Sequence, residues 1–231
     1  MSKDQSADGA SSAAGAGKES GGQPLGTTAA ALLGLLALRP WTTYELAKQA
    51  QRSLEWFWPR AERKLYDEPK KLVSRGYATA EVQRTGRRSS TVYSITPAGR
   101  RALKVWLGDE PRSRPSFEVE QLVRVFFGDQ GSAAQLLAAI ERAGDQAREA
   151  LAELGAIVAA AEPDDQVLRE RDATSAVGLR LVLDLHRAIV DWSEWATEIV
   201  DDWTDTRASG WEGYRDVYDE ATAYARPQEE G

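Results

Sequence analysis

The first strongly apolar stretch of the chain is TTAAALLGLLALRP, residues 27–40. Four leucines fall within the five positions 32–36, so a helix over this stretch has almost no polar side. Pro40 ends the helix, because proline disfavours helical backbone in the residue before it. The pattern therefore predicts a short helix that other elements surround.

A second helix is indicated by the next stretch, WTTYELAKQA, residues 41–50. Thr42 and Glu45, three residues apart, form the pattern of a capping box, which marks a helix start. The apolar side of this helix would consist of Leu46, Ala47 and Ala50.

A third helix is predicted from Pro59, which suits the first helical position, to Gly76, which suits the C-terminal cap. At about 100° per residue, its apolar side and its charged side fall opposite each other. The apolar side holds Ala61, Leu65, Pro69 and Leu72, and the charged side holds Arg60, Arg63, Lys64, Asp67 and Lys71. We expect Pro69 to bend or break the last turn.

Alternating patterns then predict a β-hairpin, with strands in YATAEVQ (77–83) and TVYSI (91–95). The turn RTGRRSS lies between them, and Gly86 in it can adopt a positive φ. Thr96 followed by Pro97 marks the start of a fourth helix.

Beyond residue 131 the pattern is helical. One long helix is predicted from Ser132 to about Ala161, and a second from about Ala173 to Trp203, with Pro163 between them. Apolar residues in the second recur at coiled-coil spacing, which is typical of a helix that pairs with another. This predicted seam consists of Leu185, Ile189, Trp192, Ala196, Ile199 and Trp203. A short terminal helix over WEGYRDVYDEATAYA would have Trp211, Tyr214, Val217, Tyr218 and Ala221 on one side.

The order helix, helix, helix, strand, strand, helix is that of a winged helix-turn-helix, in which the hairpin is the wing. We therefore predict a mainly α protein with an N-terminal winged helix-turn-helix domain and a long α-helical C-terminal domain. The expected boundaries are residues 28–108 and 109–231. Residues 1–27, rich in Ala, Gly and Ser, are expected to form a disordered tail.

Charge is distributed unevenly between these two parts. Residues 28–108 carry 15 Lys/Arg and 6 Asp/Glu, a net charge of +9, and residues 109–231 carry 12 and 27, a net charge of −15. This suggests a polyanion-binding domain joined to a domain with another role. The chain has no cysteine, which excludes disulfides and thiolate metal sites. It has no apolar run of membrane-spanning length and no signal-peptide pattern, so a cytoplasmic location is expected.

Several segments together resemble transcriptional regulators of the PadR family. The resemblance rests on LLGLLAL, TTYELAKQ, WPRAERKLYDEPKKLVSRGYA, TVYSITPAGRRAL and, further on, PSFEVEQLVRVFFGDQG. It implies a homodimeric, ligand-responsive repressor that binds a palindromic operator, with the long C-terminal helices at the dimer interface. It implies no cofactor. Thr43 before Tyr44, and Trp58-Pro59-Arg60 at the third helix, depart from the family's usual Gly and Ser-Pro-Gly.

Basic residues of the third helix and of the wing are the candidates for DNA contacts, because guanidinium and ammonium groups bind phosphates and guanine edges. Arg60 and Arg63, near the start of the helix, are the candidates for base reading. The alternative is an ordinary solvated surface. The full candidate set is Arg60, Arg63, Lys64, Asp67, Lys71, Arg84, Arg87, Arg88 and Ser89.

Aromatic side chains are candidates for binding a small aromatic or hydrophobic effector, which the resemblance places near the junction of the two domains or at the dimer interface. This candidate set is Trp106, Phe126, Phe127, His186 and Trp192. Core and dimer packing is the alternative role for the tryptophans, and His186 alone makes no metal site.

No catalytic motif is present, so we predict that the protein is not an enzyme. Two other classes fit the pattern less well. One is a winged-helix adaptor that binds proteins, and the other is a small-molecule sensor without operator-specific DNA binding. The basic third helix and wing favour DNA over the adaptor.

Overall fold

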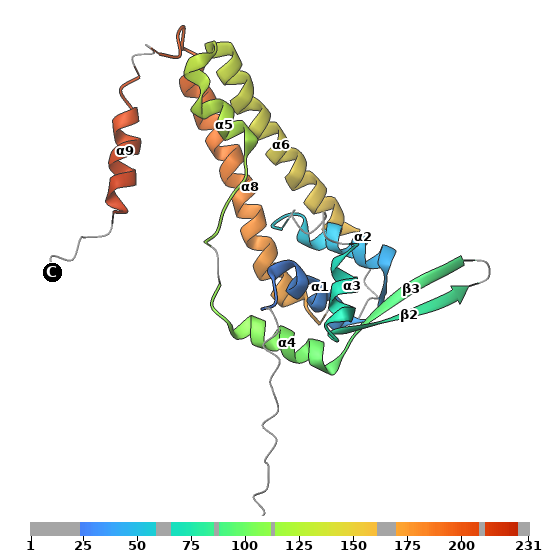
Figure 1. The fold of residues 1–231 in the computed structure, drawn as a ribbon. Coiled ribbons are helices and arrows are strands. Elements are labelled where there is room, and N and C mark those ends of the chain that lie inside the picture. Colours follow the sequence, from blue (N-terminus) through green and yellow to red (C-terminus); the bar gives the residue numbers. More distant parts are fainter. Residues whose placement is uncertain are drawn as a thin grey trace, which may run out of the picture.

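The computed structural model describes residues 24–58, 66–85, 88–111, 114–160, 170–207 and 211–225, with only the backbone of Thr85 and Arg88. They form a winged helix that carries a long helical hairpin (Figure 1). Of the predicted tail, residues 1–27, positions 1–23 lie outside the described residues. Across the described ranges, no helix combines the length and the apolar character needed to cross a membrane.

The winged helix consists of α1 (Thr27–Leu38), β1 (Trp41–Thr42), α2 (Thr43–Leu54), α3 (Glu68–Ser74), β2 (Ala78–Thr85), β3 (Arg88–Ile95) and α4 (Pro97–Gly108). After it come α5 (Glu120–Phe126), a 3-10 turn (Gly128–Gln130), α6 (Ala133–Ala159), α8 (Asp172–Val200) and α9 (Tyr214–Ala223). The predicted mainly α class with a winged helix is confirmed.

Helix α1 lies at the centre of the winged helix. Leu32, Leu33 and Leu36 are almost completely buried, and α2, α3, α4 and β3 all pack around them. This arrangement explains why the sequence of α1 has no polar side. The indole of Trp41 donates a 2.7 Å hydrogen bond to the Leu35 carbonyl, and the guanidinium of Arg39 stacks on its ring at 3.6 Å. These two contacts hold the segment that follows α1 against that helix.

The capping box predicted at the start of α2 is present. Thr42 Oγ1 accepts from the Glu45 backbone N–H at 3.2 Å, and Glu45 Oε2 accepts from the Thr42 N–H at 2.9 Å. The backbone hydrogen bond to Thr42 is the main cause that lowers the pKa of Glu45, with the Thr42 hydroxyl second and Arg39 a smaller contribution.

Replacing Glu45 with glutamine tests this pKa shift, because Gln keeps the capping geometry and removes the charge. A lowered pKa stabilises the fold at pH values above the unfolded-state pKa of about 4.3, and this contribution disappears as the pH falls through the folded-state pKa. Glu45→Gln is thus expected to lower the free energy of unfolding near pH 7 and to change it very little in acid. The loss near pH 7 should be at most about 1 kcal/mol, because the carboxylate is partly exposed. Urea unfolding at several pH values measures it, and a constant difference across pH would contradict it.

The wing is an antiparallel hairpin whose register runs from Ala78–Ile95 to Thr85–Arg88. The two-residue strand β1, which the sequence pattern does not reveal, pairs with the other edge of β3 through Trp41–Tyr93. Tyr93 and Ala78 are buried at the base of the hairpin, whereas Val82 further out is 68% exposed. The outer half of the hairpin therefore projects from the body (Figure 1).

The third helix differs from its prediction. Tyr66 and Asp67 form a turn, and α3 begins only at Glu68, so a continuous helix from Pro59 to Gly76 is wrong. Pro69 occupies the first turn of α3, where its missing N–H leaves no hydrogen bond unmade, instead of breaking the last turn. Gly76 ends the helix with a φ of 73°, as its capping role requires.

Helices α6 and α8 form an antiparallel hairpin (Figure 1). The start of α6 is a second capping box, in which Ser132 and Gln135 exchange hydrogen bonds. Of the predicted seam of α8, Ala196 is buried, Trp192 and Trp203 pack against the α6–α8 cluster, and Leu185, Ile189 and Ile199 are half-buried. The buried residues of α8 are Val182, Ser193, Ala196 and Val200.

Small residues lie where α6 and α8 approach most closely. Gly144 of α6 lies so close to Ser193 that a Cβ at position 144 would be 2.1 Å from Ser193 Oγ. The two helices therefore approach through Gly144 and Ser193, with the larger side chains of α8 flanking the contact. Arg148 reinforces it by bonding Glu194 across the hairpin at 2.8 Å, and that bond is the main cause of its raised pKa.

Candidate nucleic-acid interface

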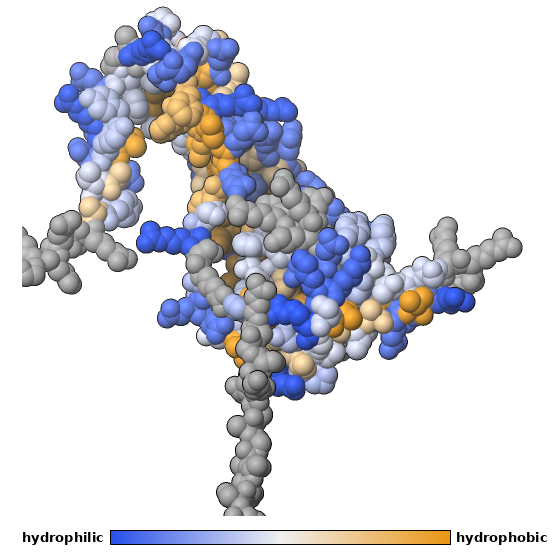
Figure 2. Space-filling view, viewed as in Figure 1, coloured by the Kyte–Doolittle hydropathy of each residue, from blue (hydrophilic) through white to orange (hydrophobic). Residues whose placement is uncertain are grey.

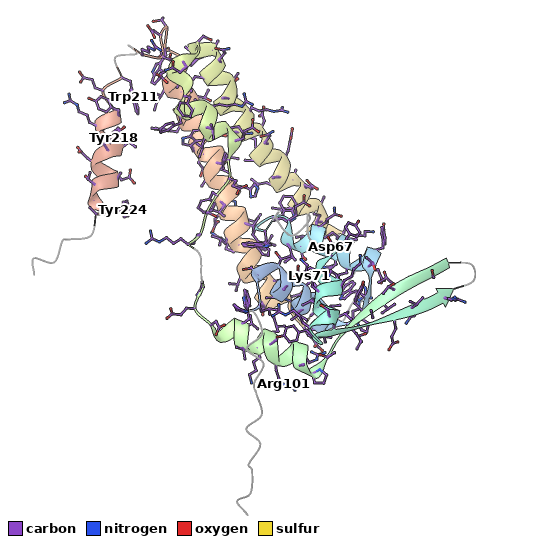
Figure 3. All side chains as sticks on the ribbon, in the orientation of Figure 1. Asp67, Lys71, Arg101, Trp211, Tyr218 and Tyr224 are labelled. Atoms are coloured by element: carbon purple, nitrogen blue, oxygen red, sulfur yellow. The ribbon has the colours of Figure 1, made fainter. Side chains whose placement is uncertain are left out.

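Helix α3 has charged side chains on one side and buried apolar side chains on the other. Pro69 and Leu72 are buried against α1, which confirms the predicted apolar side at these two positions. Lys70 and Lys71 project outward, with 72% and 61% of their side-chain surface exposed. Figure 3 shows Lys71 on this short helix and Asp67 just before it.

Each lysine of α3 has an acidic neighbour. Lys70 Nζ lies 3.9 Å from Asp67 Oδ1, and Lys71 Nζ donates to Glu68 Oε2 at 3.3 Å. The described helix is therefore close to neutral, not strongly basic. The exposed Lys70–Asp67 pair contributes less than about 1 kcal/mol, so Lys70 can exchange it for a phosphate at little cost, whereas Glu68 in the other pair is only 14% exposed.

The wing contributes the second group of polar side chains. Arg84 on β2 faces Ser89 on β3 across the ladder, and both are exposed on the projecting half of the hairpin. Figure 2 shows hydrophilic residues interspersed with hydrophobic ones along the projecting part of the hairpin. A hairpin of this kind can follow a phosphate backbone, with Arg84 as a charge-assisted donor.

Five predicted DNA contacts lie outside this geometry. Arg60, Arg63, Lys64 and Arg87 fall outside the described residues, and so does the side chain of Arg88. Among the predicted residues, the structure therefore places Asp67, Lys71, Arg84 and Ser89.

Helix α2 carries exposed residues that were not among the predicted DNA contacts. Tyr44 is 74% exposed in the first turn, and Lys48, one turn later, is exposed on the same side. The capping box immediately before Tyr44 fixes this turn. The spacing of Tyr44 and Lys48 within a helix-turn-helix was the signal that could have identified them.

The candidate effector residues do not converge on one pocket. Trp106 packs against the core of the winged helix, and Trp192 packs against the cluster formed by α6 and α8. Phe126 and Phe127 lie edge to face on α5, with centroids 5.0 Å apart and their surfaces largely exposed.

His186 occupies a different place, where α8 meets the winged helix. Its ring lies edge-on to Trp56, with the centroids 6.1 Å apart, and its Nδ1 donates to the Val182 carbonyl at 2.8 Å. Trp56 lies just after α2, so this contact joins α8 to the winged helix.

A groove lies elsewhere, between α5 and α6, with a volume of about 610 Å³. Of the candidate effector residues, only Phe127 lines it. We name it the α5–α6 groove; its lining includes Arg124, Phe127, Leu136, Ala138, Arg142 and Gln146. Over the described ranges, no three His, Asp or Glu side chains are grouped as metal ligands would be.

The architecture is that of a winged helix joined to a C-terminal helical hairpin. Residues 32–105 match the model of the PadR-like family of transcriptional regulators, and residues 119–201 match the model of the virulence activator alpha C-terminal region. The winged helix of this chain is thus PadR-like, and the resemblance predicted from the sequence is confirmed. No curated protein matches the chain by sequence.

Solved structures with this fold include PadR of Bacillus subtilis in complex with operator DNA, with 20% identity and a TM-score of 0.63 over 74% of this chain and 98% of that chain. The same protein with p-coumaric acid has 22% identity and a TM-score of 0.58 over 78% and 98%. A PadR-like regulator from Bacillus cereus has 16% identity and a TM-score of 0.65 over 78% and 99%. At these identities the likeness concerns the fold.

Proposed function

We propose that this chain is a ligand-responsive transcriptional repressor that binds a palindromic operator as a homodimer. One observation carries the proposal: a PadR-like winged helix presents exposed Lys71 on α3 and Arg84 on a projecting wing. The protein in one structure with the same fold, Bacillus subtilis PadR, is bound to operator DNA.

In this proposal, residues 28–108 bind DNA and residues 109–231 mediate dimerisation and effector binding. Helix α3 and the segment before it enter the major groove, where Arg60 and Arg63 read bases. Lys71, Arg84, Arg87, Arg88 and the wing serines contact phosphates and set the register. Binding to chromosomal DNA implies a cytoplasmic location.

Exposed apolar side chains on the C-terminal part support the dimer. Phe126 of α5 is 80% exposed, and Val123, Phe127, Val177 and Leu181 are also largely exposed. Figure 2 shows apolar residues gathered on this part of the molecule. A two-fold dimer would cover such a surface and present two winged helices to two half-sites.

A small aromatic or hydrophobic effector is the proposed signal, by analogy with the p-coumaric acid in the structure of Bacillus subtilis PadR. Trp106, Phe126, Phe127, His186 and Trp192 stay as candidate contacts. The Trp56–His186 contact offers a route, because a ligand that moves α8 relative to α2 would change the separation of the winged helices.

Fluorescence anisotropy with DNA from upstream of the protein's own gene tests the proposal. We expect at least about a hundredfold preference over random DNA, with affinity falling steeply as salt rises. Inserting about five base pairs between the half-sites should abolish the preference, since it places them on opposite faces of the duplex. Addition of a phenolic acid such as p-coumaric acid should release the DNA.

The other outcomes are equally specific. Equal, weak binding to both DNAs would contradict operator recognition, and no binding to either at low salt would favour the adaptor. Ligand binding that leaves operator affinity unchanged would favour the small-molecule sensor.

A further inference from the structure

The segment after α8 is held firmly at one end of the helical hairpin. Trp211 packs edge-on to Trp195 of α8 at 6.0 Å between ring centroids and also contacts Trp203 at 6.4 Å. Upstream of it, Arg207 Nε donates to the Asp129 carbonyl at 2.9 Å, and Thr206 Oγ1 donates to the Gly131 carbonyl at 3.3 Å. The starting point of α9 is therefore fixed relative to the hairpin.

Beyond Trp211, the apolar side of α9 stays exposed in the part of the chain that the structure describes. We call residues 211–225 the C-terminal arm. Tyr214, Val217, Tyr218 and Ala221 share one side of α9, yet none of its residues is buried, and Tyr218 is 68% exposed. Figure 3 shows Tyr218 and Tyr224 on the part of the arm that stands away from the hairpin. A ten-residue helix is barely stable in water by itself, so α9 needs a surface to pack against.

The arm lies outside both segments that match family models, because the second of these segments ends at residue 201. What covers α9 therefore has to be judged from this chain itself. Among the described residues, the α5–α6 groove is a surface of suitable chemistry, because Phe127 is exposed there and Leu136 and Ala138 also belong to its lining.

Charge favours the same pairing. Helix α9 carries Asp216, Asp219 and Glu220 against a single Arg215, so it is acidic. Arg124, Arg142 and Glu120 line the groove, and Glu120 pairs with Arg124 at 2.6 Å, so the lining keeps a net charge of +1 and Arg142 is exposed. Tyrosine-rich helices are also typical anchors of protein interfaces, because the ring fills apolar space while its hydroxyl stays at the polar rim.

We propose that α9 packs into the α5–α6 groove of a second copy of this chain, so that two copies exchange arms. A second copy is favoured over the same chain because α9 lies clear of its own groove while Trp211 holds its base (Figure 1). One chain carries both surfaces, so a two-fold axis fills both grooves at once. The inference rests on the proposed homodimer and assigns it an interface between α9 of one copy and the α5–α6 groove of the other.

Engineered cysteines test the exchange cleanly, because the chain has none of its own. Ala221→Cys lies on the apolar side of α9, and Ala138→Cys lies on the groove. Mixing the two single variants with a short bis-maleimide should give a covalent pair of chains. Ala223→Cys, on the opposite side of the same helix, is the matched control and should link about tenfold less. Equal yields from positions 221 and 223 would overturn the proposal, and so would linkage that occurs only within one chain of a double variant.

Dimer affinity separates failure of the arm from failure of the dimer. By sedimentation equilibrium, Tyr218→Asp should weaken dimerisation by about tenfold or more, while Ala223→Asp should leave it unchanged. An unchanged dimer with Tyr218→Asp would overturn the arm and leave the homodimer standing. An unmodified chain that stays monomeric would overturn both.

Discussion

Replacing Gly99 with alanine is expected to destabilise the protein by about 2–4 kcal/mol, although alanine is the better helix former. Gly99 lies in the first turn of α4 and is fully covered. A Cβ at position 99 would be 2.1 Å from the Tyr77 backbone oxygen and 2.9 Å from Ile95 Cγ1. Both neighbours belong to the base of the wing, so the added methyl must push α4 away from the sheet.

The contacts around Gly99 make that displacement costly. The Tyr77 carbonyl accepts from the Thr96 N–H at 3.0 Å, and Thr96 Oγ1 donates to the Gly76 carbonyl at 2.7 Å. The same hydroxyl accepts from the Gly99 N–H at 3.0 Å as the cap of α4. Moving α4 would therefore weaken the cap and its connection to the wing together.

Gly178→Ala is the matched control for this prediction. Gly178 lies in the interior of α8 on an exposed side, and an added Cβ would meet nothing within 4 Å. There alanine is expected to stabilise the protein by about 0.5–1 kcal/mol, because it lowers the entropy cost of folding. Urea unfolding of the two variants should give shifts of opposite sign; shifts of the same sign would contradict the close contact between α4 and the wing.

Local signals in the sequence predicted most of the fold. The Thr42–Glu45 box and Thr96 with Pro97 each mark a helix start and are found where expected, and the helix predicted from Ser132 also begins there. These signals work because capping involves only residues close in sequence.

Features that depend on distant residues were not predictable in the same way. The close approach of α8 to α6 depends on Gly144, nearly fifty positions from Ser193, and not only on the side chains of α8. Strand β1 is formed by two residues, and only their pairing with Tyr93 and Val92 reveals it. The start of α3 at Glu68 contradicted a helical pattern that looked continuous from Pro59.

The same distinction applies to the candidate site. The sequence indicated that Lys71 and Arg84 are surface cations on a winged helix, and the structure places both on exposed positions. It did not indicate the pairing of Lys71 with Glu68, because Glu68 was not assigned to the charged side. Nor did it separate the aromatic residues into a core member, Trp106, and exposed ones such as Phe126.

Reversing two of these charges is expected to cause the largest loss of DNA binding. Lys71→Glu combined with Arg84→Glu should weaken operator binding by about a hundredfold or more and flatten its salt dependence by about two units of slope. The two residues lie on separate elements, α3 and the wing, so their effects should nearly add. Lys71→Glu also leaves Glu68 without its partner and so places two carboxylates near the phosphates.

The pattern across DNA sequences decides what these residues contact. If both bind phosphates, affinities for operator and random DNA should fall by the same factor. The control is Arg114→Glu with Arg171→Glu, two exposed arginines outside the winged helix, which gives the same change in net charge. Anisotropy titrations across a salt series compare the two double variants, with circular dichroism to verify that both are folded. If the control loses as much affinity as Lys71→Glu with Arg84→Glu, binding depends only on the overall charge of the protein, and α3 and the wing are not its DNA-binding surface.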